Sequence, residues 1–260
     1  MSLEREGVAK RIAANELVRR AIALFPDQAR SHNYPAGDFL PAKRLIETAL
    51  DIDPSNPQTH WMMCLVLAVM RDIERALPQC RSVTSLFPED ARAHTMLGEV
   101  LFLKGDFENA IAEYRIAVQL DPNSGPYQGL GLALLKARKM EEAEKAFRHK
   151  IRLDPNHVES HANLGLLLGI KRNWAGALAE YKTAVGLDRD KPETHFQLAV
   201  FYLFMWGRLR HEGVAHEWQI AEASREMREF LRLVPNTSAN LENIETARFF
   251  FSELERGAYQ

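Results

Sequence analysis

Histidine is the residue type in this sequence whose spacing first suggests chemistry. Four histidines recur at intervals of 34, 67 and 34 residues, and a tyrosine stands where the long interval skips a place: His60, His94, Tyr127, His161 and His195. Imidazole nitrogen is a common zinc ligand, and zinc holds nitrogen at about 2.0–2.1 Å. Whether these rings could share a metal depends on how far apart a 34-residue interval places them.

A second cluster has the letters of a zinc protease without its spacing. The protease motif places two histidines four residues apart on one helical face, with a glutamate between them. In the segment His211-Glu212-Gly213-Val214-Ala215-His216-Glu217 the histidines are five residues apart. On a helix they would be about 140° out of line, and Gly213 lies in the middle. We interpret the segment as a loop with solvated His and Glu side chains, and we predict no catalytic residue and no metal site.

Composition sets broad limits on function. The chain has 260 residues, of which 46% are hydrophobic and 26% charged, and its formal net charge is −2. This balance argues against a nucleic-acid binder, which would normally carry a strongly basic patch. No apolar run approaches the roughly 20 residues needed to cross a bilayer, so no membrane insertion is expected. Without an apolar signal region at the N-terminus, the cytoplasm is the default expectation, and the periplasm is the alternative if a signal peptide was removed.

Prolines punctuate the chain at a fixed period. Pro54, Pro88, Pro122 and Pro155 are 34, 34 and 33 residues apart, and three of them follow an aspartate. Proline cannot continue a helix, and it disfavours helical geometry in the residue before it. The period therefore predicts helical units of about 34 residues.

The residues between the prolines repeat as well. Leu-Gly pairs at 97–98, 130–131 and 164–165 are each followed by an alanine and then an aromatic residue: Ala110 and Tyr114, Ala143 and Phe147, Ala177 and Tyr181. This pattern resembles the tetratricopeptide repeat (TPR), and the resemblance is close over residues 58–189. It implies an all-α, right-handed superhelical solenoid of antiparallel helix pairs with a C-terminal capping helix. Gly and Ala would let the paired helices approach closely.

The repeat period predicts the elements and their grouping. Helix pairs are expected at 58–70 with 73–86, 91–104 with 107–120, 125–137 with 140–153, and 158–171 with 174–187. We divide the chain into a helical cap and degenerate repeat (1–56), four regular repeats (57–191), a fifth repeat with an insertion (192–237) and a capping helix (238–260). The cap should contain helices at 4–24 and 38–52, with a loop over 26–37. The insertion should be irregular around 207–213.

The resemblance also bears on the histidines and cysteines. All five members of the histidine series occupy the slot where the family carries Trp, facing the partner helix. Equivalent slots in adjacent repeats lie near 10 Å apart, too far for two rings to share a zinc ion. We therefore expect packed histidines and no cofactor. Cys64 and Cys80 fall in the close-approach slot and the aromatic slot of one repeat and could face each other. We interpret them as two buried thiols.

The opposite face of each first helix is unusually apolar. In a TPR array this face forms the concave wall, and a helix that is apolar on nearly all sides is normally covered on all sides. The predicted peptide-binding groove comprises Trp61, Met62, Leu65, Met96, Glu99, Phe102, Gln128, Leu132, Asn163, Leu166, Phe196, Gln197 and Val200. The basic clamp with which some TPR proteins hold acidic C-terminal tails is absent from these slots.

These observations predict a non-catalytic scaffold or adaptor that binds an apolar helix or an extended peptide of a protein partner. The main alternative is self-association through the C-terminal helix, where Phe249 and Phe250 add aromatic surface. A regulatory module of an enzyme is a more remote alternative. A further possibility is that the chain's own segment from Phe25 to Leu40 fills the groove.

Overall fold

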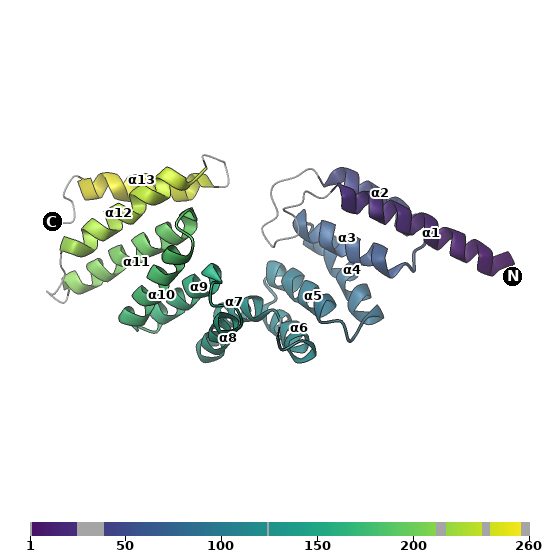
Figure 1. Ribbon diagram of the computed structural model, residues 1–260, viewed down its shortest axis with the longest axis horizontal. Helices are drawn as coiled ribbons and strands as arrows, with labels where there is room; N and C mark the ends of the chain where they lie inside the picture. The colour runs from purple at the N-terminus through teal and green to yellow at the C-terminus, as the bar shows by residue number, and fades with distance from the viewer. Residues whose placement is uncertain (1, 25–38, 124, 212–216, 236–239, 256–260) are drawn as a thin grey trace. The chain divides into compact units, whose positions relative to one another are not determined.

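The computed structural model describes residues 2–24, 39–123, 125–211, 217–235 and 240–255, and each regular element in these ranges is an α-helix (Figure 1). The first part of the chain forms α1 (Ser2–Ala23), α2 (Leu40–Ile52), α3 (Pro57–Val69), α4 (Ile73–Leu86), α5 (Ala91–Lys104), α6 (Phe107–Leu120) and α7 (Tyr127–Lys136). The second part forms α8 (Met140–Leu153), α9 (Val158–Ile170), α10 (Trp174–Leu187), α11 (Pro192–His211), α12 (Glu217–Leu233) and α13 (Leu241–Glu255). The bounds of the eight helices predicted at 58–187 are confirmed to within two residues at each end. None of the described helices is long and apolar enough to cross a membrane.

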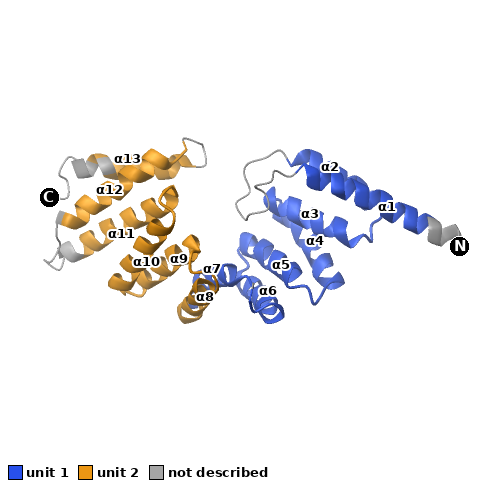
Figure 2. Cartoon of the chain, viewed as in Figure 1, with its two compact units in different colours: residues 1–139 blue, residues 140–260 orange. Residues whose placement is uncertain are grey.

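The chain divides into two compact units, residues 1–139 and 140–260 (Figure 2). In unit 1, α1 packs on α2, α3 on α4 and α5 on α6, and each pair contacts the next helix along the chain. In unit 2, α9 packs on α10 and α11 on α12, while α8 contacts α9 and α13 covers α12. The predicted grouping of repeats into 57–191 and 192–237 remains a prediction.

The turn between the two helices of a repeat has the same backbone geometry each time. One residue in each turn has a left-handed φ: Arg71 (60°), Gly105 (85°), Arg138 (59°) and Arg172 (63°). The next residue then donates its N–H back into the first helix, as Asp106 does to the Leu101 carbonyl at 2.9 Å. This arrangement closes the helix end and reverses the chain.

Contact between paired helices depends on the predicted small and aromatic slots. A Cβ added at Gly98 would lie 2.8 Å from ring atoms of Tyr114, and one at Gly165 would lie 3.1 Å from the ring of Tyr181. Both tyrosines are buried, and burial raises the pKa of Tyr181 to about 12. The glycines are therefore required by the close approach of a ring.

The two segments predicted to be irregular are 207–213 and 26–37. The insertion expected around 207–213 is wrong for residues 207–211, because α11 continues as one helix to His211. Residues 212–216, which hold most of the protease-like cluster, and the expected loop at 26–37 lie outside the described residues. At the C-terminus, α13 packs its Ile244 and Ala247 into a buried cluster with Met227 and Phe230, as a capping helix should.

Candidate functional site

The histidine series ties each first helix to its own second helix. Nδ1 of each ring bonds a side chain on the second helix: His60 to Gln79 (2.8 Å), His94 to Glu113 (2.7 Å), His161 to Glu180 (2.7 Å) and His195 to Glu226 (2.6 Å). Nε2 bonds the backbone carbonyl six residues earlier, that of Pro54, Pro88, Pro155 and Arg189 respectively. The Tyr127 hydroxyl replaces the second of these bonds by donating to the Pro122 carbonyl. The predicted packing role is confirmed.

Both nitrogens of each ring are thus engaged within the repeat, Nδ1 by a side chain of the second helix and Nε2 by a backbone carbonyl. Across the part of the chain that the structure describes, no three His, Cys, Asp or Glu side chains are grouped to hold a metal ion.

The cysteine interpretation is wrong. Cys64 of α3 and Cys80 of α4 form a disulfide, with their Cα atoms 5.1 Å apart. They do face each other across the helix pair, in the two slots that the repeat assigns to them. The interpretation as free thiols failed because slot assignment alone does not give the distance between two backbones.

In unit 1 much of the predicted groove is partly covered. Met62 and Met96 are each only 9% exposed. The side chains of Trp61, Leu65, Glu99, Phe102, Gln128 and Leu132 are half-buried. The guanidinium of Arg92 lies 5.4 Å from the centre of the Trp61 ring, which adds a cation–π contact there. This part of the groove is therefore a shallow, mixed surface.

In unit 2 the same face is apolar and open. Leu166 (46% exposed) and Ile170 (51%) lie one turn apart on α9, and Val200 (40%) and Phe204 (55%) lie one turn apart on α11. The two helices contact each other, so the four side chains belong to neighbouring helices. We call these four residues the unit 2 apolar face. Asn163, the groove asparagine, is half-buried on α9, one turn before Leu166.

Two predicted groove residues on α11 have different surroundings. The Phe196 ring packs 4.9 Å from that of Phe230, against the buried cluster of α11, α12 and α13, so it contributes to the core. The Oε1 atom of Gln197 is buried and has no hydrogen-bond partner within the described ranges.

The sequence missed the aromatic support of the unit 2 apolar face. Trp174, the first residue of α10, lies 5.7 Å from Phe204 and 6.5 Å from Phe201, measured between ring centres. The Arg208 guanidinium lies 5.6 Å from the centre of the Trp174 ring. Nothing in the period of the repeat marks these residues, because the contact joins one helix pair to the next.

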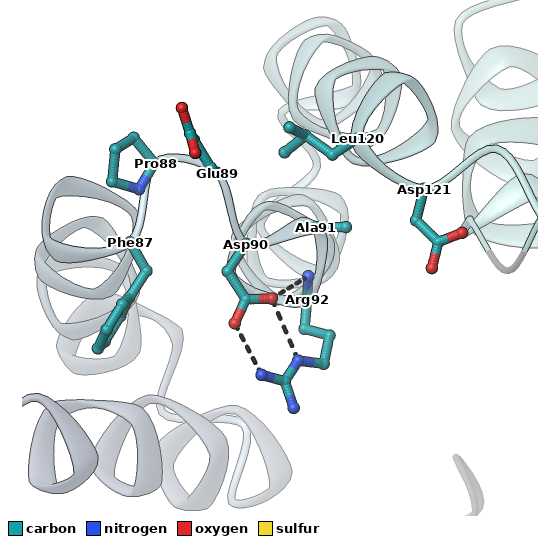
Figure 3. A pocket seen from close by; sticks show the side chains of 8 residues that line it. All are labelled: Phe87, Pro88, Glu89, Asp90, Ala91, Arg92, Leu120 and Asp121. Carbon is teal, nitrogen blue, oxygen red and sulfur yellow. Dashed lines mark hydrogen bonds and ion pairs between the residues drawn. The ribbon is translucent and has the colours of Figure 1, made fainter.

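An open pocket of about 620 Å³ lies elsewhere in unit 1, where the α4–α5 loop meets the end of α6 (Figure 3). Its lining includes Phe87, Leu120 and Asp121, together with the ion pair between Asp90 and Arg92. Hydrogen bonding from Arg92 holds the pKa of Asp90 below its ordinary value. These two charges therefore satisfy each other, whereas Glu89 and Asp121 add two further acidic residues to the lining.

Only one of the two phenylalanines predicted for self-association is exposed. Phe249 is 61% exposed on α13, whereas Phe250 is half-buried and packs against the cluster that α13 covers. The two rings meet edge to face at 5.8 Å.

Comparison with known proteins agrees with this architecture. Residues 65–125 and 129–192 match the model of the tetratricopeptide repeat. No curated protein matches the sequence. Similar solved structures include PilW, a type IV pilus biogenesis factor (15% identity, TM-score 0.69, covering 90% of this chain and 98% of that one). They also include Pseudomonas aeruginosa PilF (18% identity, TM-score 0.67, 95% and 99%) and YrrB, described as a TPR protein with an unusual peptide-binding site (16%, 0.51, 77% and 97%). The all-α superhelical repeat fold is thereby confirmed.

Proposed function

Because this chain belongs to the tetratricopeptide-repeat family, we propose that it is a non-catalytic scaffold that holds an apolar helix or extended peptide of a protein partner on the inner faces of its first helices. The family supports an interaction scaffold in general. The choice of surface depends on one observation, the unit 2 apolar face. Four large apolar side chains are 40–55% exposed there on two adjacent helices.

The chemistry of this face suits an apolar partner. Leu166, Ile170, Val200 and Phe204 carry no charge, and their spacing of four residues on each helix forms two parallel apolar rows. A partner helix with apolar residues at intervals of three and four could lie along these rows. The exposed rows would then lose water contact, which is the main source of affinity in such contacts.

The test uses variants that change the face without changing the fold. Leu166→Glu with Phe204→Glu places two carboxylates on the face. Because both positions already contact water, the melting temperature should change little. Binding of a panel of amphipathic helical and extended apolar peptides, measured by fluorescence polarisation, should weaken at least about tenfold, since an unpaired charge in an apolar contact is costly.

A matched control exists in the same unit. Leu153 is 40% exposed at the end of α8, a second helix. Leu153→Glu should leave peptide binding unchanged. Equal binding by the double variant and the wild type would refute the proposed surface. In unit 1, Leu132→Glu tests whether the groove is filled by the chain itself, because filling by the segment from Phe25 to Leu40 predicts a less stable free protein.

Exposed Phe249 supports a second candidate, self-association through α13. Sedimentation at increasing protein concentration tests it. A dimer that Phe249→Ser dissociates, without a change in helix content, would support this candidate over a monomeric scaffold.

A further inference from the structure

Four helix pairs use the same two positions for their closest contact. One position is small and the other large in three of them. Gly98 meets Tyr114 and Gly165 meets Tyr181, and the corresponding residues of α11 and α12, Ala199 and Met227, belong to one buried cluster. In α3 and α4 both positions hold a small residue, Cys64 and Cys80, which are 0% and 1% exposed. The disulfide therefore occupies the place where the other pairs have a ring or a methionine chain.

Two free thiols would give α3 and α4 less contact with each other than a glycine and a tyrosine give, although Met96 Sδ of α5 lies 2.7 Å from Cys64 Sγ. A tyrosine opposite a glycine brings a whole ring into the contact, whereas two cysteines bring two sulfur atoms. Close packing between helices tolerates little unfilled volume. When the sulfurs are bonded, the covalent link holds the two helices together despite the smaller side chains.

Helix α4 has a second weakness that α6 and α10 do not share. Pro78 lies inside it. Proline has no N–H, so the bond to the carbonyl four residues earlier is missing, and its ring crowds that carbonyl. The helix pair that lacks the large packing residue thus also contains the less stable second helix.

We propose that the Cys64–Cys80 disulfide is the element that holds α3 against α4, that this pair keeps its native packing only while the sulfurs are bonded, and that the chain accordingly folds in an oxidising compartment. Structural disulfides persist in such compartments and are rare where thiols are kept reduced. Of the two compartments that the sequence left open, the buried bridge favours the periplasmic or another extracytoplasmic one over the cytoplasm.

Reduction of the Cys64–Cys80 disulfide is a two-electron step. A dithiol reductant supplies two electrons and two protons, the bond between the two sulfurs breaks, and each cysteine gains an S–H. The reductant leaves as its own disulfide. Both cysteines are buried, so a reductant reaches them only when the pair opens. The bridge is therefore suited to a structural role.

Hydrogen exchange of the full chain tests the proposal, with α9 and α10 as the internal reference. Reduced protein is prepared by unfolding and refolding in excess dithiothreitol and is compared with oxidised protein. Amides of α3 and α4 should exchange at least about tenfold faster after reduction, while those of α9 and α10 should not change. The melting midpoint of unit 1 should fall by about 5–10 °C, as loss of a bridge across this 16-residue interval implies. Equal exchange in the two states would overturn the proposal.

Two variants sharpen the test. Cys64→Ala with Cys80→Met copies the pair found in α11 and α12, so its exchange should not respond to the reductant. Cys64→Ser with Cys80→Ser should behave like the reduced protein in both conditions. If the first variant fails to fold, the comparison of oxidised with reduced wild type still decides.

The compartment is tested by trapping thiols with an alkylating reagent in intact cells that produce the protein, followed by denaturation. Cys64 and Cys80 should remain unmodified until a reductant is added. Two alkylated cysteines in the folded native protein would overturn both the bridge and the compartment.

Discussion

The helix pairs α3/α4 and α5/α6 are adjacent repeats with the same backbone geometry, but different side chains make the corresponding contacts. In both, a histidine on the first helix bonds the second helix, but its partner is Gln79 in one pair and Glu113 in the other. The close contact is a disulfide in one and Gly98 against Tyr114 in the other. The left-handed turn residue is Arg71 in one and Gly105 in the other.

This difference shows which features the repeat keeps constant and which it lets vary. Backbone geometry is held to the period: the turn residue and the histidine recur at 34 residues, and the bond lengths to Gln79 and Glu113 differ by 0.1 Å. Side-chain chemistry is free to vary as long as the helices stay in contact. Exchanging the corresponding residues between the two pairs therefore measures how much each residue contributes to the free energy of unfolding.

The largest expected effect is at the close contact of α5/α6. Gly98→Ala places a methyl group 2.8 Å from the Tyr114 ring. The ring has little room to move, because its far end also lies close to Gly129, where an added Cβ would be 2.9 Å from Tyr114 Cζ. We expect a loss of about 1–3 kcal/mol in the free energy of unfolding, measured by urea denaturation. Gly186→Ala, at a site in α10 with open space around it, is the control and should not destabilise.

Exchanging the side chain that bonds the histidine should have the next largest effect on the free energy of unfolding. Glu113→Gln copies α3/α4 and replaces a charged acceptor with a neutral one. Since charged hydrogen bonds are about twice as strong as neutral ones, we expect a loss of about 1 kcal/mol in unfolding free energy. Gln79→Glu makes the reverse exchange and should raise stability. A loss in both variants would mean that the surroundings of the pair, not its charge, decide the preference.

The exchange of the turn residue should have an effect no larger than the exchange of the histidine's partner. Gly105→Arg puts a side chain on a backbone with φ 85°, where a Cβ meets open space, so only backbone strain opposes it. We expect a loss of about 1 kcal/mol. Arg71→Gly relieves the same strain in α3/α4, with a gain of a few tenths of a kcal/mol because glycine loses more freedom on folding. Thermal melts of the two single variants measure both effects, and opposite signs are required.

The helix pair α9/α10 differs from the other two in a contact whose stability should depend on pH. Asn56 and Asp90 cap α3 and α5, whereas α9 is capped by His157, whose Nδ1 accepts the Ser160 N–H at 3.2 Å. Burial lowers the pKa of His157 from its ordinary value of 6.5. The folded protein thus favours the neutral ring, and stability is lost as the pH falls below about 6.5 until the lowered pKa is passed. Loss of a cap suggests about 0.5–1 kcal/mol.

The matched variant for this prediction is His157→Asn, which copies the cap of α3. Its stability should vary less between pH 7 and pH 5 than that of the wild type, as followed by urea denaturation at each pH. The same pH dependence in both proteins would show that other groups cause it.

Much of the fold could be predicted because its determinants are local. Prolines and Leu-Gly pairs locate helix ends, and the histidine slot predicts which helix each ring faces. The length of α11 was missed because the extra residues of the fifth repeat were expected to form an irregular insertion around 207–213, whereas the helix continues through Gly207 to His211. Burial of Met62 and Met96 was missed because it depends on contacts between helices that no single repeat encodes. Leu166 and Val200 of the unit 2 apolar face were among the predicted groove residues, but the greater exposure of this face compared with unit 1 was not predicted.

The bridge between α3 and α4 also has a mechanical consequence. When a repeat protein is pulled from its ends, each unfolded residue adds at most about 3.3–3.6 Å of length. The 16-residue interval between Cys64 and Cys80 would extend roughly 55 Å as free chain, whereas the bonded cysteines keep their Cα atoms near 5 Å. Under tension the oxidised chain is therefore shorter at full extension by about 50 Å, and the force passes through the sulfur atoms instead of unravelling the turn between the two helices.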